Sequence, residues 1–249
     1  IPLLKQWYQR RVHGARLVEC KMIVFPVSTV VYSRTCPGMT RGTPVLRRCC
    51  QALHDLELLK ALQSEIRHEM SSNPFQDNGG GSLGDFVVDW DSPKFEDVVL
   101  QRKCETGEEV TISALLGPLT HATRGKYPRN ALMKVCITKP GLSSILQLDC
   151  GVSSEGDSAT KFDILNAYHL QSSASLSPSI YRGPSFWSLD PDLRSALKEY
   201  VAEMGIGEGL GRFLLHYLHN KEQTQYVKWL HQLQTLVSNG PNASNGDER

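Results

Sequence analysis

The hydrophobic positions along the chain change their spacing twice, and each change predicts a different element. From Gln51 to Met70 they recur three or four residues apart without Gly or Pro, which predicts an amphipathic helix. From Asp85 to about residue 170 they recur every second residue, which predicts β-strands. Beyond residue 190 the helical spacing returns. This order of helix, sheet and helices predicts an α+β fold.

The strand-like runs are joined by turns and loops and not by helices. Gly, Pro and polar residues separate them, as in Pro140-Gly141 and in the loop over residues 151–160. Because a parallel pair needs a long crossover, consecutive runs are expected to pair antiparallel as a meander, with two open edges that need cover from helices or a partner subunit. The runs cover residues 86–91, 98–100, 108–116, 130–139, 143–150 and 161–170.

Two helices are predicted toward the C-terminus. Asp190 and Pro191 have the pattern of an N-cap followed by Pro at the first helical position, and Gly205 is expected to end this helix. A glycine-dense corner then leads to a last helix over residues 212–237. The apolar faces of the first and last helices are candidates for helix packing or for contact between subunits. They carry Leu59, Leu62, Ile66, Tyr226, Leu230 and Leu233.

The first strand-like run, FVVDWD, carries two carboxylates in alternation with apolar residues. Phe86, Val88 and Trp90 are expected on the dry face of the sheet. Asp89 and Asp91 are expected on its polar face, about 6 to 7 Å apart from the rise per residue. Such a pair of carboxylates could serve catalysis, but the alternation favours a solvated face or the rim of an assembly.

Charge is distributed unevenly along the chain. Residues 1–50 hold nine Lys or Arg and one acidic residue; subtracting these from the totals of 27 and 26 leaves 18 basic and 25 acidic residues, a net charge of −7, in residues 51–249. A basic head rich in Ser and Thr predicts an organelle transit peptide over 1–50, with a disordered basic tail as the alternative. The folded domain is expected over 51–240 and a polar tail over 241–249. The three Cys of the body lack C-x-x-C spacing, which favours a reducing compartment.

Residues 80–84, GGSLG, match the G-x-S-x-G pattern of a hydrolase nucleophile, with Ser82 as the candidate. That chemistry needs a strand before the serine and a helix after it, because the sharp turn exposes the hydroxyl. Here a Gly- and Asn-rich loop precedes Ser82 and a strand-like run follows it. The context therefore favours a linker.

Two further patterns are open to a functional interpretation. His216 and His219 are three residues apart on the last helix and could bring two imidazoles to a metal, but no third ligand is fixed beside them. The basic residues Arg124, Lys126 and Arg129 surround a tyrosine and could contact RNA phosphates, although the acidic body favours an exposed loop. We therefore predict no catalytic centre, cofactor or metal.

Long blocks of the sequence nevertheless resemble one family. The blocks FVVDWDSP, DVVLQRK, GEEVTISALLGP, MKVCITKPGLSSILQLDC, LQSSASLSPSIYRGPSFWSLDPDLRSALKEY and KEQTQYVKWLHQL are similar, in the same order, to the mitochondrial glycoprotein family in its plant form. The resemblance implies a twisted seven-stranded antiparallel sheet with the first and last helices packed together beside it. It also implies a ring-shaped homotrimer.

The same resemblance implies a function without catalysis. Family members are acidic proteins of the mitochondrial matrix that bind several partners and support mitochondrial translation and respiration, so the expected partners are other copies of the chain and matrix proteins such as ribosomal or respiratory-complex biogenesis factors. Plastid or nuclear location, an RNA-associated role and a hydrolase built on Ser82 remain alternatives. The loop over 151–160 carries only Glu155 and Asp157, fewer acidic residues than the family's long acidic loops.

Overall fold

A computed structural model describes residues 44–71, 81–119, 127–155, 159–171, 181 and 183–238, with side chains from residue 53 onward. The chain divides into two compact units, residues 1–53 and 54–249. The described elements belong to the second unit, apart from the first turns of helix α2 (Pro44–Ser71). The expected presequence over 1–50, the tail over 241–249 and the acidic loop residue Asp157 therefore lie largely outside the described residues.

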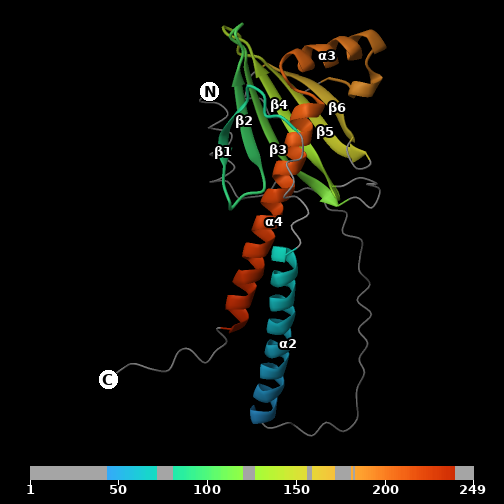
Figure 1. The fold of residues 1–249 in the computed structure, drawn as a ribbon. Helices are drawn as coiled ribbons and strands as arrows, with labels where there is room; N and C mark the ends of the chain where they lie inside the picture. The colour runs from blue at the N-terminus through green and yellow to red at the C-terminus, as the bar shows by residue number, and fades with distance from the viewer. Residues whose placement is uncertain are drawn as a thin grey trace, which may run out of the picture. The chain divides into compact units, whose positions relative to one another are not determined.

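The described strands form one antiparallel sheet in which every strand pairs with its neighbours in the sequence (Figure 1). This arrangement confirms the predicted meander. Six strands are formed among the described residues, whereas the family resemblance implies seven. Their bounds are β1 Val87–Asp91, β2 Val98–Lys103, β3 Glu109–Leu119, β4 Arg129–Thr138, β5 Ile145–Glu155 and β6 Ala159–Leu170.

Helix α3 (Pro191–Glu203) begins at the residue that the sequence predicts and ends two residues before Gly205. The Asp190 carboxylate accepts a hydrogen bond of 2.9 Å from the backbone N–H of Asp192, which satisfies one of the free donors of the first turn. Gly205, two residues after the helix, has a φ of +78°. This left-handed conformation costs a residue with a Cβ about 1–2 kcal/mol, which explains the glycine.

Helix α4 (Glu208–Ser238) begins four residues earlier than predicted, through Gly209 and Gly211. Glycine normally weakens a helix, but here tertiary packing compensates for it. A Cβ at Gly211 would lie 3.0 Å from the Val152 side chain, so the glycine lets the helix approach the sheet closely. No helix of the described chain is long and apolar enough to cross a membrane.

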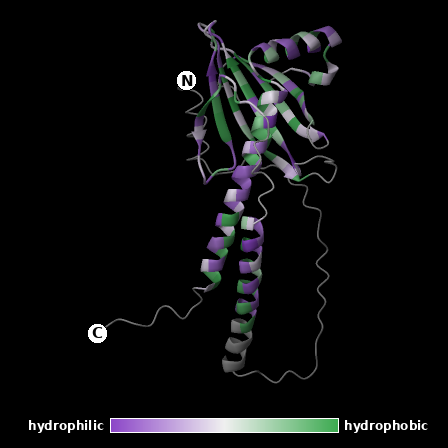
Figure 2. Cartoon of the chain, in the orientation of Figure 1, coloured by the Kyte–Doolittle hydropathy of each residue, from purple (hydrophilic) through white to green (hydrophobic). Residues whose placement is uncertain are grey.

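The hydrophobic core lies between the sheet and the first half of α4, which crosses one face of the strands (Figure 1). Alternate residues of β3 to β5 point toward the helix, and the strands accordingly change between hydrophobic and hydrophilic colours along their length (Figure 2). The turn η1 (Phe186–Ser188) and the end of α3 complete this core. Helix α4 contributes Leu210, Leu214, Leu215 and Leu218, each at most 3% exposed.

The opposite face of the sheet carries mostly polar or half-exposed residues, as is common for an antiparallel sheet with one wet face. Thr111, Cys136 and Gln147 lie in register across its centre. Cys136 is a free thiol on this face, and burial among its neighbours raises its pKa to about 11. The core-facing Cys150 is likewise free, and burial raises its pKa to about 12.

Strand β1 departs from the simple alternation that the sequence predicts. Val88 pairs with Leu100 and Trp90 with the adjacent Val99, so Asp89 is an extra residue that forms a β-bulge. After the bulge the side chains change faces. Val88 precedes the bulge and pairs with the buried Leu100, although it is itself 44% exposed. Asp91 follows the bulge, pairs with the buried Val98 and binds Lys221 of α4. The expectation that the two carboxylates share one polar face is therefore wrong.

Candidate interaction surface

Beyond the end of the sheet, the second half of α4 packs against α2. From residue 53 onward, the buried centre of this contact consists of Leu62, Ile66 and Leu230, each at most 7% exposed, with Leu233 and Val237 packed against them. Of the six apolar residues that the sequence predicts for this role, the structure brings four together. Leu59 is half-buried, and Tyr226 is 36% exposed.

Tyr226 and Trp229 form an aromatic pair on the solvent side of α4. Their rings are stacked with centroids 5.9 Å apart, and Trp229 is 50% exposed. The Tyr226 hydroxyl donates a hydrogen bond of 3.2 Å to Glu65 of α2. Desolvation and this acceptor raise the pKa of Tyr226. The pair therefore offers flat apolar area next to a carboxylate.

Other apolar side chains on the two helices are also exposed. In this part of the helices, hydrophobic and hydrophilic colours are mixed around the axis (Figure 2). Exposed apolar side chains that gather on one element commonly mark a protein interface, and Trp and Tyr are the commonest anchors of such interfaces. We define the helix-pair surface as the exposed residues Leu56, Leu58, Met70, Tyr226, Trp229 and Leu236.

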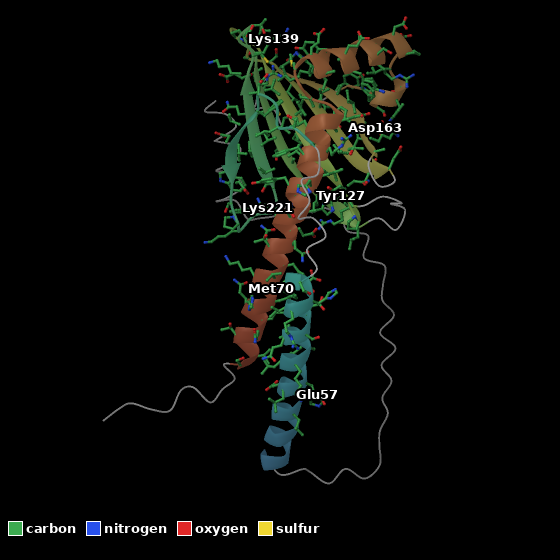
Figure 3. All side chains as sticks on the ribbon, viewed as in Figure 1. Glu57, Met70, Tyr127, Lys139, Asp163 and Lys221 are labelled. Carbon is green, nitrogen blue, oxygen red and sulfur yellow. The ribbon has the colours of Figure 1, made fainter. Side chains whose placement is uncertain are left out.

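A polar junction fastens α4 to the edge of the sheet just before the helix pair begins. Lys221, whose side chain is 9% exposed, binds the carboxylate of Asp91 and donates a 2.7 Å hydrogen bond to the carbonyl of Asp97 (Figure 3). The Tyr217 hydroxyl donates to the same carboxylate. Burial alone would raise the pKa of Asp91, but the bonds from Lys221 and Tyr217 hold it below its ordinary value. Desolvation and the bond to Asp91 raise the pKa of Tyr217 to about 12.

Arg129 forms a second tie at the end of β4. Its guanidinium donates to the carbonyls of Gly117 at 2.5 Å and Leu116 at 3.2 Å, and it also binds the carboxylate of Glu222 on α4. These bonds occupy the group that we considered for RNA contact. The other two candidates, Arg124 and Lys126, lie outside the described residues.

The two histidines of α4 lie against Tyr127, whose position is labelled in Figure 3. His216 Nδ1 lies 3.3 Å from the Tyr127 hydroxyl, and its Nε2 lies 2.9 Å from the Asn220 amide. His219 is 2% exposed, and this burial lowers its pKa. Its Nδ1 donates a hydrogen bond of 2.7 Å to the carbonyl of Leu215. Within the described ranges, no group of three or more potential ligands could hold a metal ion.

Ser82 lies in a loop that docks on the start of α4. Its backbone N–H donates to the carbonyl of Gly209 at 3.2 Å, and its hydroxyl accepts a 3.1 Å bond from the N–H of Gly84. A Cβ on Gly81 would lie 2.2 Å from the backbone nitrogen of Phe213, which explains the glycine at this position. Strand β1 follows the loop, so the local geometry lacks the strand–turn–helix order of a nucleophile elbow.

Sequence reasoning missed the junction of Asp91, Tyr217 and Lys221. One signal for it exists: Lys221 continues the helical row of Leu214 and Leu218, where an apolar residue is expected. A cation on the packed face of a helix requires a nearby anion, because an unpaired buried charge is costly. Its partner could not be identified from the sequence, since the bulge that turns Asp91 toward α4 leaves no clear pattern.

The structure resembles solved proteins at the level of the fold. A crystal structure of the Trypanosoma brucei p22 protein matches with a TM-score of 0.59 and 16% identity, over 74% of this chain and 99% of that one. A Leishmania major protein of unknown function, described as a sequence homologue of human p32, matches with a TM-score of 0.57 and 19% identity over the same shares.

Sequence comparison finds a similar curated protein and a matching family model. The mitochondrial acidic protein mam33 of Schizosaccharomyces pombe is 30% identical over 106 residues, which are 41% of this chain and 39% of that protein. The matched part thus spans well under half of that relative. The model of the MAM33 mitochondrial glycoprotein family matches residues 118–237, from the end of β3 to the end of α4. Residues 118–237 are therefore similar to the mitochondrial glycoprotein family.

Proposed function

We propose that the protein is a non-enzymatic, multi-partner binding protein of the mitochondrial matrix that acts as a homotrimer. In this role it supports mitochondrial translation and oxidative phosphorylation, as a scaffold or chaperone-like partner for other matrix proteins. The mitochondrial name of the yeast relative and the basic composition of residues 1–50 support the location.

The helix-pair surface is the observation that carries this proposal. Among the side chains that the structure describes, the contact between α2 and α4 buries three residues to 7% exposure or less, while Trp229, Leu236 and Met70 remain 50% to 71% exposed. Two helices with so small a shared core gain little stability from each other, because helices in water are stabilised mainly by burying an apolar face. A neighbouring subunit or a partner protein that covers these side chains supplies the missing burial.

Three of the residues first considered as an oligomer face are excluded from direct contact with a partner, whereas Tyr226 remains exposed. Leu62, Ile66 and Leu230 are covered within the chain, so the contacts between subunits are assigned to their exposed neighbours on the same helices. The ties made by Lys221 and Arg129 hold α4 in a fixed position on the sheet, and they support this role by presenting the exposed side chains on a rigid element.

The mass of the assembly tests the proposal directly. Multi-angle light scattering of residues 51–249 is expected to give three times the chain mass. The Trp229→Asp variant is expected to lower that mass, because it places a charge on an exposed apolar contact. A monomer in the unmodified protein would contradict the trimer. Co-purification from mitochondria of translation or respiratory-assembly proteins, lost in the same variant, tests the partner class.

A further inference from the structure

Trp187 is exposed although it follows a residue at the centre of the core. Phe186 is 0% exposed, whereas Trp187 is 57% exposed, and the two rings meet edge to face with centroids 6.3 Å apart. The buried phenyl ring anchors the short η1 turn. It thereby holds the neighbouring indole in a fixed position at the surface, next to α3.

Two cations of α3 lie against this indole. The guanidinium carbon of Arg194 is 5.6 Å from the ring centroid, and the Lys198 ammonium is 5.9 Å from it. Both distances are within the range of cation–π attraction. Residues four apart on a helix are neighbours, so the two positive charges also repel each other. The indole offsets this repulsion only in part, and an anion would complete the neutralisation.

The carboxylates of the described chain do not provide that anion. Neither cation forms an ion pair with any described residue. The carboxylate at the head of the helix, Asp190, caps the N–H of Asp192 at 2.9 Å. These two positive charges are therefore available to an external ligand.

The basic and the acidic residues of helix α3 lie on opposite sides of the helix. At 3.6 residues per turn, Lys198 lies about 40° around the helix from Arg194, whereas Glu199 and Glu203 lie about 140° and about 180° from it. Asp192 falls on the same acidic side, about 160° from Arg194. The acidic residues of the helix therefore face away from the indole and leave a locally positive surface around it.

We infer that Trp187, Arg194 and Lys198 form a binding site for a nucleotide, and we name these three residues the indole–cation site. The open part of the indole stacks on the planar base, since every base has a π-face that an exposed aromatic side chain can cover. The cations bind the adjacent phosphate, for which the planar fork of Arg is well matched. A peptide carboxylate would satisfy the cations but leave the indole without a flat partner.

The nucleotide can be free or part of a single-stranded RNA, and the experiment separates these sources. Fluorescence anisotropy of a labelled octauridylate is measured with the full chain, with uridine monophosphate and a poly-glutamate peptide as competitors. Competition by the monophosphate at concentrations near its own Kd identifies a free nucleotide as a sufficient ligand. Binding of the octamer without such competition identifies a strand that needs contacts on both sides of one base.

Two variants test the residues separately. Trp187→Ala is expected to weaken binding about 5- to 150-fold through the loss of one stacked base, with partial recovery in Trp187→Phe. In the double variant Arg194→Gln, Lys198→Gln, the binding constant should depend less on salt. The negative slope of its logarithm against the logarithm of the salt concentration should become shallower by about 1.4, since each phosphate contact to a single strand contributes about 0.7. The matched control is Lys60→Gln with Lys228→Gln, which removes two exposed charges from α2 and α4.

Thermal melts of every variant show whether it is folded, and the double variant keeps the test valid if Trp187→Ala unfolds. The inference is overturned if the unmodified chain binds neither probe or if poly-glutamate competes as well as the nucleotides do. It is also overturned if the control variant loses as much affinity as the α3 double variant does. Unchanged binding in a folded Trp187→Ala protein would exclude the stacked base.

Discussion

Asp91 and Lys221 are 130 residues apart in the sequence and form an ion pair that joins the edge strand β1 to helix α4. The pair lies where α4 passes the end of the sheet on its way to α2 (Figure 3). Tyr217, one turn earlier on the helix, donates to the same carboxylate. This one contact therefore fixes both the outer strand of the meander and the direction of the helix that carries the exposed aromatic pair.

Removing the charge of Asp91 should destabilise the protein. We expect Asp91→Asn to lower the free energy of unfolding by about 1–3 kcal/mol, the range for a hydrogen bond to a charged group, because Lys221 then keeps a nearly buried ammonium without its counter-charge. Urea unfolding measures the change. Asp89→Asn, at the exposed bulge position two residues away, is the control and should change the value by less than about 0.5 kcal/mol. Equal effects of the two substitutions would contradict this role.

The ion pair of Asp91 and Lys221 predicts that the stability of the protein depends on pH in the acidic range. Because the folded protein holds the pKa of Asp91 below its ordinary value of about 3.9, its contribution is complete above about pH 4. The contribution is lost as the pH falls through the folded pKa. The difference in stability between the unmodified protein and Asp91→Asn should therefore shrink on acidification below pH 4. A constant difference down to pH 2 would show that the carboxylate charge is not the source.

His219 predicts a second, milder dependence at higher pH. Burial lowers its pKa in the folded protein, whereas the unfolded chain has a value of about 6.5. The stability linked to the neutral ring is therefore complete above about pH 6.5 and falls as the pH decreases toward the folded pKa. His219→Gln should reduce the change of the melting temperature between pH 7 and pH 5. The exposed His231→Gln is the matched control, and an equal flattening there would refute the assignment.

Two glycines in one short corner should respond differently to alanine. Gly205 has a φ of +78°, and an added Cβ would lie 2.5 Å from Nη1 of Arg102. We expect Gly205→Ala to cost about 1–2 kcal/mol, since the left-handed conformation disfavours a Cβ. Gly207 has open space around its Cα, so Gly207→Ala should be neutral or raise stability by up to about 1 kcal/mol. Calorimetric melts of both variants measure this difference, and similar losses would contradict it.

Neighbouring residues of α4 should separate folding from assembly. Leu230 is 3% exposed, so Leu230→Asp buries a charge and should lower stability by at least about 3 kcal/mol. Trp229 is 50% exposed, so Trp229→Asp should cost about 1 kcal/mol or less and act mainly on the mass in light scattering. Retention of the full mass in a folded Trp229→Asp protein would exclude the helix-pair surface as the contact between subunits.

Most of the fold was predictable because its signals are local. Alternating residues and turn formers identify strands β2 to β6, and the sequence Asp190-Pro191 with Gly205 identifies both ends of α3. The start of α4 was not predictable from local preference, since Gly209 and Gly211 weaken a helix in isolation. The close approach of Gly211 to Val152, which depends on the folded sheet, explains the glycine at that position of the helix.

The candidate surface was predictable only in part. Spacing alone indicates that Leu62, Ile66 and Leu230 share an apolar face, but it does not say how much of that face the partner helix covers. In the structure these three residues bury one another, whereas Trp229, directly before Leu230 on the same helix, is exposed. The β-bulge at Asp89 caused the clearest error, because one extra residue reverses the faces of every residue that follows it.

The place of α4 after the six strands in the sequence has a consequence for biosynthesis. The six strands precede the helix, and each pairs with its neighbour, so the sheet is able to form while the chain is still emerging from the ribosome. The leucines between 210 and 218 that cover its apolar face are made after all six strands. Until then the apolar face of the sheet is exposed to solvent, and it remains exposed in a chain that stops before Leu210. Termination of translation before Leu210 should therefore produce an aggregating chain and not a shorter functional protein.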